Sequence, residues 1–314
     1  MALEVTSAYV GEALEQILVK ATTGNELVER GLIKVVPNIV KDYYLPRMRV
    51  GKMLQKPKEQ PDDSNSKGDF KYDERKLSPK EFMAFTTFNP RSFEHAWRKF
   101  QPKGELVYSE LSEEGKALLL SELAKAVNFE LGGHIINGEY AEGDDDTKLF
   151  DGILKRIKDG TETIKIAAPV AVTESNIQAT MAKIRKAAPK AIRNHRNLRF
   201  LMSIEDWEKY DDALTALPNK GTDPTSTNAK RFKGIPIETL ADMPEHVIVL
   251  TLASNDNSSN LWLGIGNIDD QTTIQVDKMT NAGERYFFKM KMKADTQIMW
   301  DDYAVFYNGR SAGA

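Results

Sequence analysis

The stretch SEEGKALLLSELAKAVNFELGGHIING, residues 112–138, carries the strongest structural signal in the chain. Within it, apolar residues recur at every fourth position: Leu119, Leu123, Val127, Leu131 and Ile135. This spacing predicts one helix over residues 112–136, with Ser112 as its N-cap. At 1.5 Å per residue the helix would be roughly 36 Å long, which exceeds the usual length in globular proteins. Gly132 and Gly133 near its end predict either a loosened last turn or close packing on a neighbouring element.

The composition is that of an ordinary, well-packed protein and excludes several kinds of chemistry. The sequence has 314 residues, 41% hydrophobic and 28% charged, with a formal net charge of −3. The near-balance of charge argues against a chain that mainly coats nucleic acid or an anionic membrane. There is no cysteine, so disulfides, thiolate metal sites and cysteine nucleophiles are excluded. The N-terminus has no signal-peptide pattern and no apolar run reaches about 18 residues, so we expect a soluble, intracellular protein without a membrane partner.

Residues 52–80 differ sharply in composition from the rest of the chain. They hold eight basic and six acidic side chains, punctuated by Pro57, Pro61 and Gly68, and have too few apolar residues for a core of their own. The segment is either a disordered loop or a long two-stranded hairpin with arms of ~14 residues, which would extend ~45 Å from the body. Because an isolated hairpin is only marginally stable in water, the second interpretation requires a surface on which the hairpin lies.

Helical and strand patterns alternate over the remainder of the chain. Helices are predicted at residues 7–21 and 173–188 and after the N-cap Ser203, and strands at residues 197–202, 246–252 and 288–307. In the last of these, Phe288, Met290 and Met292 alternate with lysines, which is typical of a strand with one buried face. This mixture of elements, without an internal repeat, predicts the α+β class.

No pattern in the sequence indicates a catalytic site. The four histidines stand apart from one another and from any cluster of carboxylates, so no metal site is expected at His95, His134, His195 or His246. The acidic residues at 144–146 and 301–302 are interpreted as a solvated loop and a strand-connecting turn. Gly264 and Gly266 lack the third glycine and the following helix of a dinucleotide fingerprint, and are also interpreted as a turn. We therefore expect a protein that is not an enzyme and has no cofactor.

The stretch from Lys183 to Arg199 is the best candidate for contact with nucleic acid. It contains seven basic residues and no acidic one. A basic face of this kind contacts phosphates without reading the sequence, but no aromatic residue interleaves with it to stack on bases. The alternative, which we prefer, is an exposed helix face or a contact with an acidic neighbour.

Short segments in a particular order carry a resemblance to a known family. FELGGHIING (129–138) is followed by FDGIL (150–154), LRFLMS (198–203), FKGIPI (232–237) and long closing strands (290–307). This order resembles the major capsid proteins of tailed bacteriophages, which have the Hong Kong 97-type fold. The resemblance covers nearly the whole chain and rests on the order of the segments. It implies structural roles for five positions of the family pattern: Gly138, Asp151, Gly152, Gly234 and Pro236.

The resemblance implies four parts: an N-terminal arm (1–49), an extended β-hairpin loop (50–85), a peripheral domain (86–159 and 269–314) and an axial domain (160–268). The helix at 112–136 would be the spine of the peripheral domain, and the loop would lie on the adjacent subunit. Seven charged residues of this loop are the expected inter-subunit contacts: Lys56, Lys58, Asp62, Asp63, Lys67, Asp69 and Lys71. Lys67 lies where certain relatives cross-link a lysine to an asparagine of another subunit, but no motif marks that asparagine, so no cross-link is predicted.

The function that the resemblance implies is that of a structural virion protein. Copies would assemble into the hexamers and pentamers of an icosahedral phage head that encloses double-stranded DNA without sequence recognition. Because the arm begins at once, assembly would be aided by a separate scaffolding protein or by none, and a portal and a decoration protein are further expected partners. The protein would belong to the virion and be assembled in the host cytoplasm. Two alternatives stay open: an encapsulin-like compartment shell that packages an enzyme, and a nucleic-acid-binding protein that uses residues 183–199.

Overall fold

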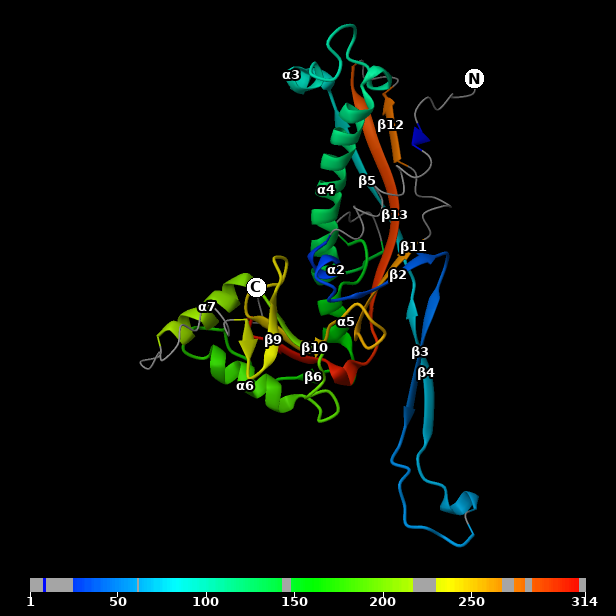
Figure 1. Ribbon diagram of the computed structural model, residues 1–314, viewed down its shortest axis with the longest axis vertical. Coiled ribbons are helices and arrows are strands. Elements are labelled where there is room, and N and C mark those ends of the chain that lie inside the picture. Colours follow the sequence, from blue (N-terminus) through cyan, green and yellow to red (C-terminus); the bar gives the residue numbers. More distant parts are fainter. Residues whose placement is uncertain are drawn as a thin grey trace.

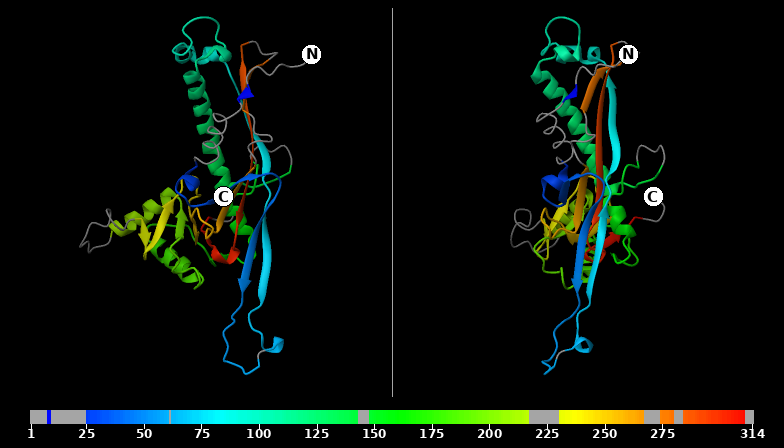
Figure 2. Two further views of the ribbon diagram at one scale, coloured as in Figure 1. Left: turned by 45° about the vertical axis from the view of Figure 1, so that its right-hand side comes forward. Right: turned by 90° about the vertical axis from the view of Figure 1, so that its right-hand side faces the viewer.

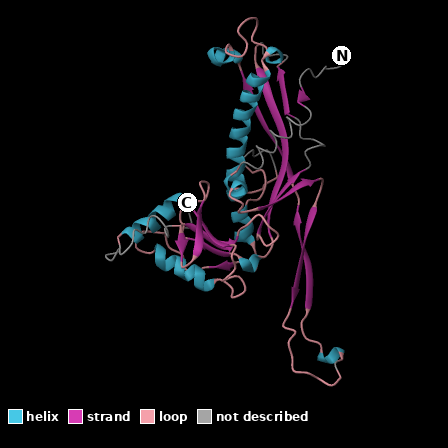
Figure 3. Ribbon diagram, viewed as in Figure 1, coloured by secondary structure: helices cyan, strands magenta, loops and turns pink. Residues whose placement is uncertain are grey.

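The protein is an elongated molecule in which two β-sheet units meet and a narrow hairpin projects from the region of their junction (Figure 1). The computed structural model describes residues 8–9, 25–60, 62–142, 148–216, 230–266, 274–279 and 284–310. Figure 2 shows that the hairpin continues the line of the longer unit, while the second unit is attached at one side. In Figure 3 the long helix runs beside the strands of the longer unit, and shorter helices accompany the strands of the other.

The first unit is a six-stranded sheet built around one long strand, β13. Its strands are β1 (Ala8–Tyr9), β12 (Ile274–Lys278), β13 (Tyr286–Ile298), β11 (Leu261–Gly266), β2 (Lys34–Ile39) and β5 (Lys80–Phe88). β13 pairs antiparallel with β12, β11 and β5, and β2 joins β11 in parallel. From Tyr286 to Lys293 the side chains alternate between buried and half-buried, which confirms the one-sided strand that the spaced lysines predicted.

Helix α4 (Glu113–Asn137) packs on this sheet and confirms the helix predicted at 112–136. Ser112 caps it as expected, since its hydroxyl accepts a hydrogen bond from the backbone N–H of Gly115 at 3.3 Å. Of the two roles predicted for the glycine pair near its end, the structure shows close packing. A Cβ atom at Gly132 would lie 3.2 Å from a carboxylate oxygen of Asp242, so glycine lets a loop of the second unit approach the helix.

The second unit is another six-stranded sheet, in the order β6-β14-β10-β7-β9-β8. Its strands are β6 (Ile164–Lys165), β14 (Val305–Asn308), β10 (Val247–Leu252), β7 (Leu198–Met202), β9 (Ile235–Thr239) and β8 (Arg231–Phe232). Helices α6 (Ile177–Ala187) and α7 (Ile204–Thr215) share one apolar cluster with these strands. Ser203 caps α7 as predicted, and every residue of β10 is buried, as expected for its continuous apolar run.

Short helices complete the fold: α2 (Glu26–Glu29), α3 (Glu94–Trp97), α5 (Ile153–Asp159), and single 3₁₀ turns at Asp63–Asn65, Pro90–Phe93, Tyr108–Glu110 and Asp301–Tyr303. The two units share a core, because one buried cluster contains Ile135 of α4, Leu263 of β11 and Val249 of β10. Among the described residues, no helix combines the length and the apolar character needed to cross a bilayer.

The strand pairing differs from the expected division of the chain at three strands. β11, expected in the axial part at 160–268, belongs to the first sheet, and β14, expected in the peripheral part, pairs with β10 in the second. β2, expected in the N-terminal arm, is also a strand of the first sheet. These pairings join segments far apart in the sequence, and local patterns carry no information about them.

Two local predictions differ from the structure. Ala8–Tyr9, near the start of the helix predicted at 7–21, form strand β1, and because the rest of that segment lies outside the described residues, the helix there stays a prediction. Gly264 and Gly266 lie in β11 and not in a turn. A Cβ atom at Gly264 would lie 2.7 Å from Cδ1 of Ile39, so this glycine permits close packing of a neighbouring strand.

Candidate assembly interface

Residues 43–77 form the projecting hairpin (Figure 1), so of the two interpretations of the charged segment the hairpin is confirmed. β3 (Tyr43–Val50) and β4 (Phe70–Leu77) pair antiparallel from Tyr43 opposite Leu77 to Val50 opposite Phe70. The hairpin begins at residue 43, earlier than the expected 50, and its arms pair over eight residues and not ~14. Beyond the ladder, the tip consists of irregular chain and one 3₁₀ turn, Asp63–Asn65.

One face of the hairpin is bound to the body of its own chain. Because opposite residues of a ladder share a face, Leu45 and Arg49 lie on the same side as Arg75. Leu45 is buried, and the two arginines reach the turn that follows β13. Arg49 forms an ion pair with Asp302, and Arg75 forms one with Asp301, each at 2.5 Å. The acidic pair at 301–302 lies in a strand-connecting turn, as predicted. That these two carboxylates hold the hairpin was not predicted.

Trp300 is the centre of this attachment. The guanidinium carbons of Arg49 and Arg47 lie 4.0 and 5.0 Å from the centroid of its ring, within the range of cation–π contacts. Asn260 holds the Trp300 backbone, since its side chain accepts the Trp300 N–H at 2.7 Å and donates to the Trp300 carbonyl oxygen at 2.9 Å. The chain passes from the first sheet to the second between Trp300 and β14, so the hairpin is attached at the junction of the two units.

The opposite face of the hairpin carries exposed apolar side chains at the end of the ladder nearest the tip. Met48 lies opposite Tyr72 and Val50 opposite Phe70, and these side chains are 40% to 69% exposed. At the tip, Leu54 is 97% exposed. Large apolar side chains gathered on one exposed surface mark a site of protein contact. The composition of the segment conceals this surface, because its charged residues dominate any count. The alternation of apolar residues at 48, 50, 70 and 72, read as two paired strands, was the signal that could have revealed it.

The charged residues expected at the inter-subunit contact surround the tip of the hairpin. All seven are exposed: Lys56, Lys58, Asp62, Asp63, Lys67, Asp69 and Lys71. Asp62 caps the 3₁₀ turn by accepting the Asn65 backbone N–H at 3.0 Å, and Lys58 donates to the Asn65 side chain. Among the residues that the structure describes, none of the seven forms an ion pair within the chain. Their role in contacts between subunits stays a prediction.

Gly138, Gly152 and Asp151 form a tight joint between α4 and α5. The Gly138 N–H donates to the His134 carbonyl oxygen at 2.8 Å, and the Gly152 N–H donates to the Gly138 carbonyl oxygen at 2.7 Å. A Cβ atom at Gly152 would lie 2.5 Å from the Gly138 nitrogen, so the two backbones leave no room for a side chain. The Asp151 carboxylate accepts the Tyr140 N–H at 2.9 Å and closes the same turn.

Gly234 and Pro236 belong to the turn and strand that follow β8. Lys233 and Gly234 have φ angles of 47° and 84°, as required for a two-residue hairpin turn between β8 and β9. Pro236 lies in β9, opposite Arg231. These two positions and the α4–α5 joint shape the scaffold that carries the hairpin.

The basic stretch at 183–199 is partly committed to contacts within the chain. Arg193 donates to the carbonyl oxygens of Lys186 and Ala188 at the end of α6, and Arg199 pairs with Glu238 at 2.8 Å. Other basic residues of the stretch stay exposed: Lys183, Lys186, Lys190 and Arg196. Arg199 thus contacts an acidic neighbour, which is one of the alternatives to nucleic-acid contact. Contact of the exposed basic residues with nucleic acid stays a prediction.

One titratable cluster lies in the second unit, and it corrects the expectation that no histidine meets carboxylates. Atoms of Asp206, Glu245 and His246 that could bind a metal lie within 4.8 Å of one another. Lys209 donates to Asp206 at 3.2 Å and to Glu245 at 2.5 Å, and so supplies the positive charge here. Burial raises the pKa of the Asp206 carboxyl, and the hydrogen bond from Lys209 opposes that rise. The cluster joins α7 to β10, because Asp206 also accepts the His246 N–H at 2.7 Å.

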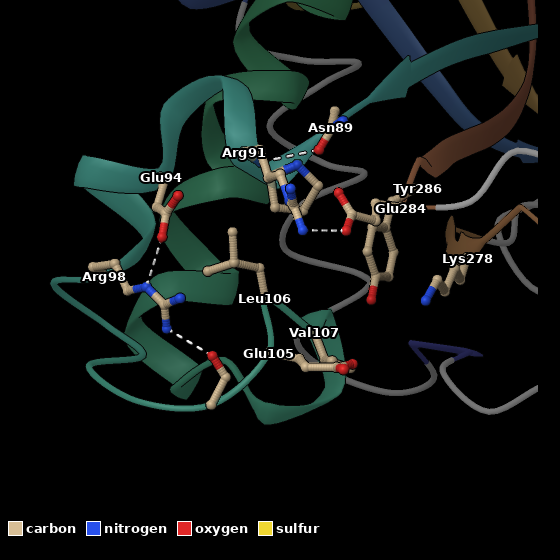
Figure 4. Close-up of a pocket in the computed structure, with 12 residues that line it drawn as sticks. Asn89, Arg91, Glu94, Arg98, Glu105, Leu106, Val107, Lys278, Glu284 and Tyr286 are labelled. Atoms are coloured by element: carbon tan, nitrogen blue, oxygen red, sulfur yellow. Dashed lines mark hydrogen bonds and ion pairs between the residues drawn. The ribbon is translucent and has the colours of Figure 1, made fainter.

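A polar cleft of about 420 Å³ lies at the end of the first unit away from the hairpin (Figure 4). Figure 4 shows Arg98 directed to Glu94, at 3.0 Å, and Arg91 directed to Glu284. Both arginines of the cleft are therefore paired with carboxylates that also line it.

Comparisons with known proteins agree with this architecture. No protein-family profile and no curated protein sequence matches the chain. The fold is similar to a structure of the satellite phage P4 procapsid including the size determination protein, with a TM-score of 0.64, 11% identity and coverage of 96% of this chain and 93% of that chain. It is also similar to the capsid of an empty GTA particle, with a TM-score of 0.58, 11% identity and coverage of 99% and 95%.

A third similar structure is a virus-like particle from Pyrococcus furiosus, with a TM-score of 0.50, 9% identity and coverage of 94% of this chain and 95% of that chain. At such low identity these similarities establish the fold. The match nevertheless extends over at least 93% of each chain in all three comparisons. The chain therefore has the Hong Kong 97-type fold of phage capsid proteins, as the order of its sequence segments predicted.

Proposed function

We propose that this chain is the major capsid protein of a tailed phage and forms the closed icosahedral shell of its head. The observation that carries the proposal is the similarity in fold to a chain of the P4 procapsid structure, which extends over 96% of this chain. The projecting hairpin supports it independently. In a single copy, the apolar side chains of Met48, Phe70 and Tyr72 are exposed, and a contact with a neighbouring copy would bury them.

Assembly would proceed through many weak contacts between copies. The hairpin would lie on an adjacent subunit, where its apolar face contributes affinity and the charged residues of its tip set the register. Each contact is modest, but a subunit held by several neighbours at once dissociates slowly because the other contacts keep it in place. Hexamers and pentamers would follow from one kind of contact repeated around a ring.

The two sheet units would be the peripheral and axial domains of the capsid subunit. The first unit, with α4 as its spine and β2 and β11 among its strands, would be the peripheral domain, and the second unit, which includes β14, the axial domain. The shell would enclose double-stranded DNA without sequence recognition. The expected partners are a scaffolding protein, a portal and a decoration protein, with assembly in the host cytoplasm and a final place in the virion.

Electron microscopy of the purified chain, alone and with any scaffolding protein encoded near its gene, tests the proposal. We expect closed shells of uniform diameter. A compact monomer under all conditions of salt, pH and scaffold would refute the proposal.

An encapsulin-like compartment shell is the second candidate, favoured by the similarity to the virus-like particle from Pyrococcus furiosus. The contents of particles isolated from the native source separate the two functions. A phage head contains double-stranded DNA that resists added nuclease, whereas a compartment shell contains a cargo enzyme and no protected DNA.

A further inference from the structure

Three lysines of the basic stretch at 183–199 have no anionic partner among the described residues. No aspartate or glutamate occurs between positions 174 and 205. Two of the seven basic residues, Arg193 and Arg199, are held by contacts within the second unit. The three lysines without an ion pair to a described residue are all exposed: Lys183, Lys186 and Lys190. An exposed group of like charges attracts ions of the opposite charge from outside the chain.

The positive charge is concentrated at the end of α6 and in the segment that joins this helix to β7. Lys183 and Lys186 lie in the second half of α6, and Lys190 lies in the turn-forming segment that follows the helix. Met181 and Ile184 bury the other side of α6 in the apolar cluster of the second unit. Because residues three positions apart share a helix face, the two helical lysines project from the side of α6 that is turned away from this cluster.

An open hollow extends this surface to the first unit. It is lined by Lys34 of β2, by His195 and Arg196 of the segment after α6, and by residues 255–258. Its one carboxylate, that of Asp256, already accepts hydrogen bonds from its own turn and lies 3.7 Å from Arg196. The two basic side chains therefore outnumber the carboxylate, and the exposed amides and hydroxyl of the turn add neutral hydrogen-bonding groups.

The composition of this surface fits a polyanion better than a protein. Between Val170 and Ile204 no large apolar side chain is exposed. Protein interfaces have apolar or aromatic side chains at their centre and contain few lysines, whereas lysine binds phosphate as a point charge. Exposed carboxylates of a second copy, such as Glu205 and Glu208 of α7, would also neutralise the lysines, but that contact would have no apolar centre. The observations therefore favour phosphate groups over a neighbouring subunit.

We propose that the end of α6 and the segment after it form the surface of the subunit that contacts the phosphate backbone of double-stranded DNA inside the shell. The contacting side chains are those of four residues: Lys183, Lys186, Lys190 and Arg196. The inference rests on the proposed shell function, and it specifies which side of the second unit faces the lumen. Because the formal net charge of the whole chain is −3, the remainder of the subunit is negative and repels DNA.

The contact is weak in one copy and strong in a shell. Each phosphate that a protein neutralises contributes about −0.9 to the slope of the logarithm of the binding constant against the logarithm of the salt concentration. Four cations in one copy therefore give a slope of about −3.6. In a closed shell many copies contact the same DNA molecule at once, so the individual contacts reinforce one another. Phosphate contacts carry no sequence information, so DNA of any sequence is bound.

Binding of a short, fluorescently labelled DNA duplex of random sequence to the unassembled chain, measured by anisotropy at several low salt concentrations, tests this surface. The α6 variant replaces three lysines by glutamine: Lys183→Gln, Lys186→Gln and Lys190→Gln. The control variant does the same at three exposed lysines outside the second unit: Lys99→Gln, Lys103→Gln and Lys278→Gln. We expect the salt slope to become less negative by about 2.7 in the α6 variant and to stay unchanged in the control. An α6 variant that binds the duplex as the unsubstituted chain does, or an equal loss in both variants, would overturn the inference.

Assembly of the same variants separates DNA from a second copy of the chain as the partner of α6. We expect the α6 variant to keep its thermal stability and to form shells in the yield of the unsubstituted chain, because the three side chains are exposed and free of subunit contacts. Loss of shells in the α6 variant alone, with unchanged thermal stability, would show that these lysines contact a neighbouring subunit and would overturn the inference. Failure of the unsubstituted chain to form any shell would instead overturn the proposed function, whatever the duplex measurement gives.

Discussion

Replacing Trp300 with alanine should release the hairpin from the body without unfolding either sheet unit. The ring lies under two guanidinium groups, at 4.0 and 5.0 Å, and 6.0 Å from the ring of Tyr303. Cation–π contacts at partly exposed sites contribute about 0.5–1 kcal/mol each, and an aromatic pair contributes a similar amount. Their sum is about 2 kcal/mol, which raises the population of detached hairpin about 30-fold.

Amide hydrogen exchange of the unassembled protein measures this change directly. Amides of β3 and β4 that exchange through detachment of the hairpin should exchange about 30-fold faster in Trp300→Ala. Amides in the centre of β10 should keep their rates. Trp207→Ala is the matched control, because it removes the same side chain from α7 in the second unit and should leave exchange in the hairpin unchanged. If Trp300→Ala leaves the rates of β3 and β4 unchanged, the attachment through Trp300 is refuted.

Three further variants test other parts of the structure. Gly152→Ala should lower the unfolding free energy by about 2 kcal/mol in a denaturant titration, because the added Cβ atom collides with backbone; unchanged stability would contradict the tight joint. Asp206→Ala should cost about 2 kcal/mol because it leaves the His246 backbone N–H without its acceptor and removes one of the two carboxylates that pair with Lys209, whereas Asp212→Ala on the same helix should cost less than about 0.5 kcal/mol. Hydrogen bonds from Ser258 hold the pKa of Asp256 well below its usual value of 3.8, so its stabilising contribution is full above that value and is lost as the pH falls below it. Asp256→Asn should therefore flatten the loss of thermal stability below about pH 4, and an unchanged acid profile would refute this assignment.

The elements that could be predicted from the sequence are those whose cause is local. The four-residue spacing of leucines fixes α4, and Ser112 and Ser203 cap their helices through neighbours three residues away. The alternation of lysine with apolar residues in β13 predicts a strand with one buried face. In each case the residues that determine the element lie within it.

The features that escaped prediction depend on residues distant in the sequence. Arg49 meets Asp302 across 253 positions, and no local pattern links them. The apolar face of the hairpin becomes visible only when the register of β3 and β4 is known, since it is composed of alternate residues from both strands. The resemblance marked Gly138 and Gly152. Glycine is needed at both positions because their backbones are in contact, and this contact is visible only in the folded chain.

Cryo-electron microscopy of particles assembled from the full-length chain tests the central claim most directly. The account predicts a closed icosahedral shell of five-fold and six-fold rings, in which each subunit keeps its two sheet units and its hairpin lies on a neighbouring copy. Particles whose subunits leave the hairpin free of any neighbour, or a chain that stays monomeric under every assembly condition, would contradict it.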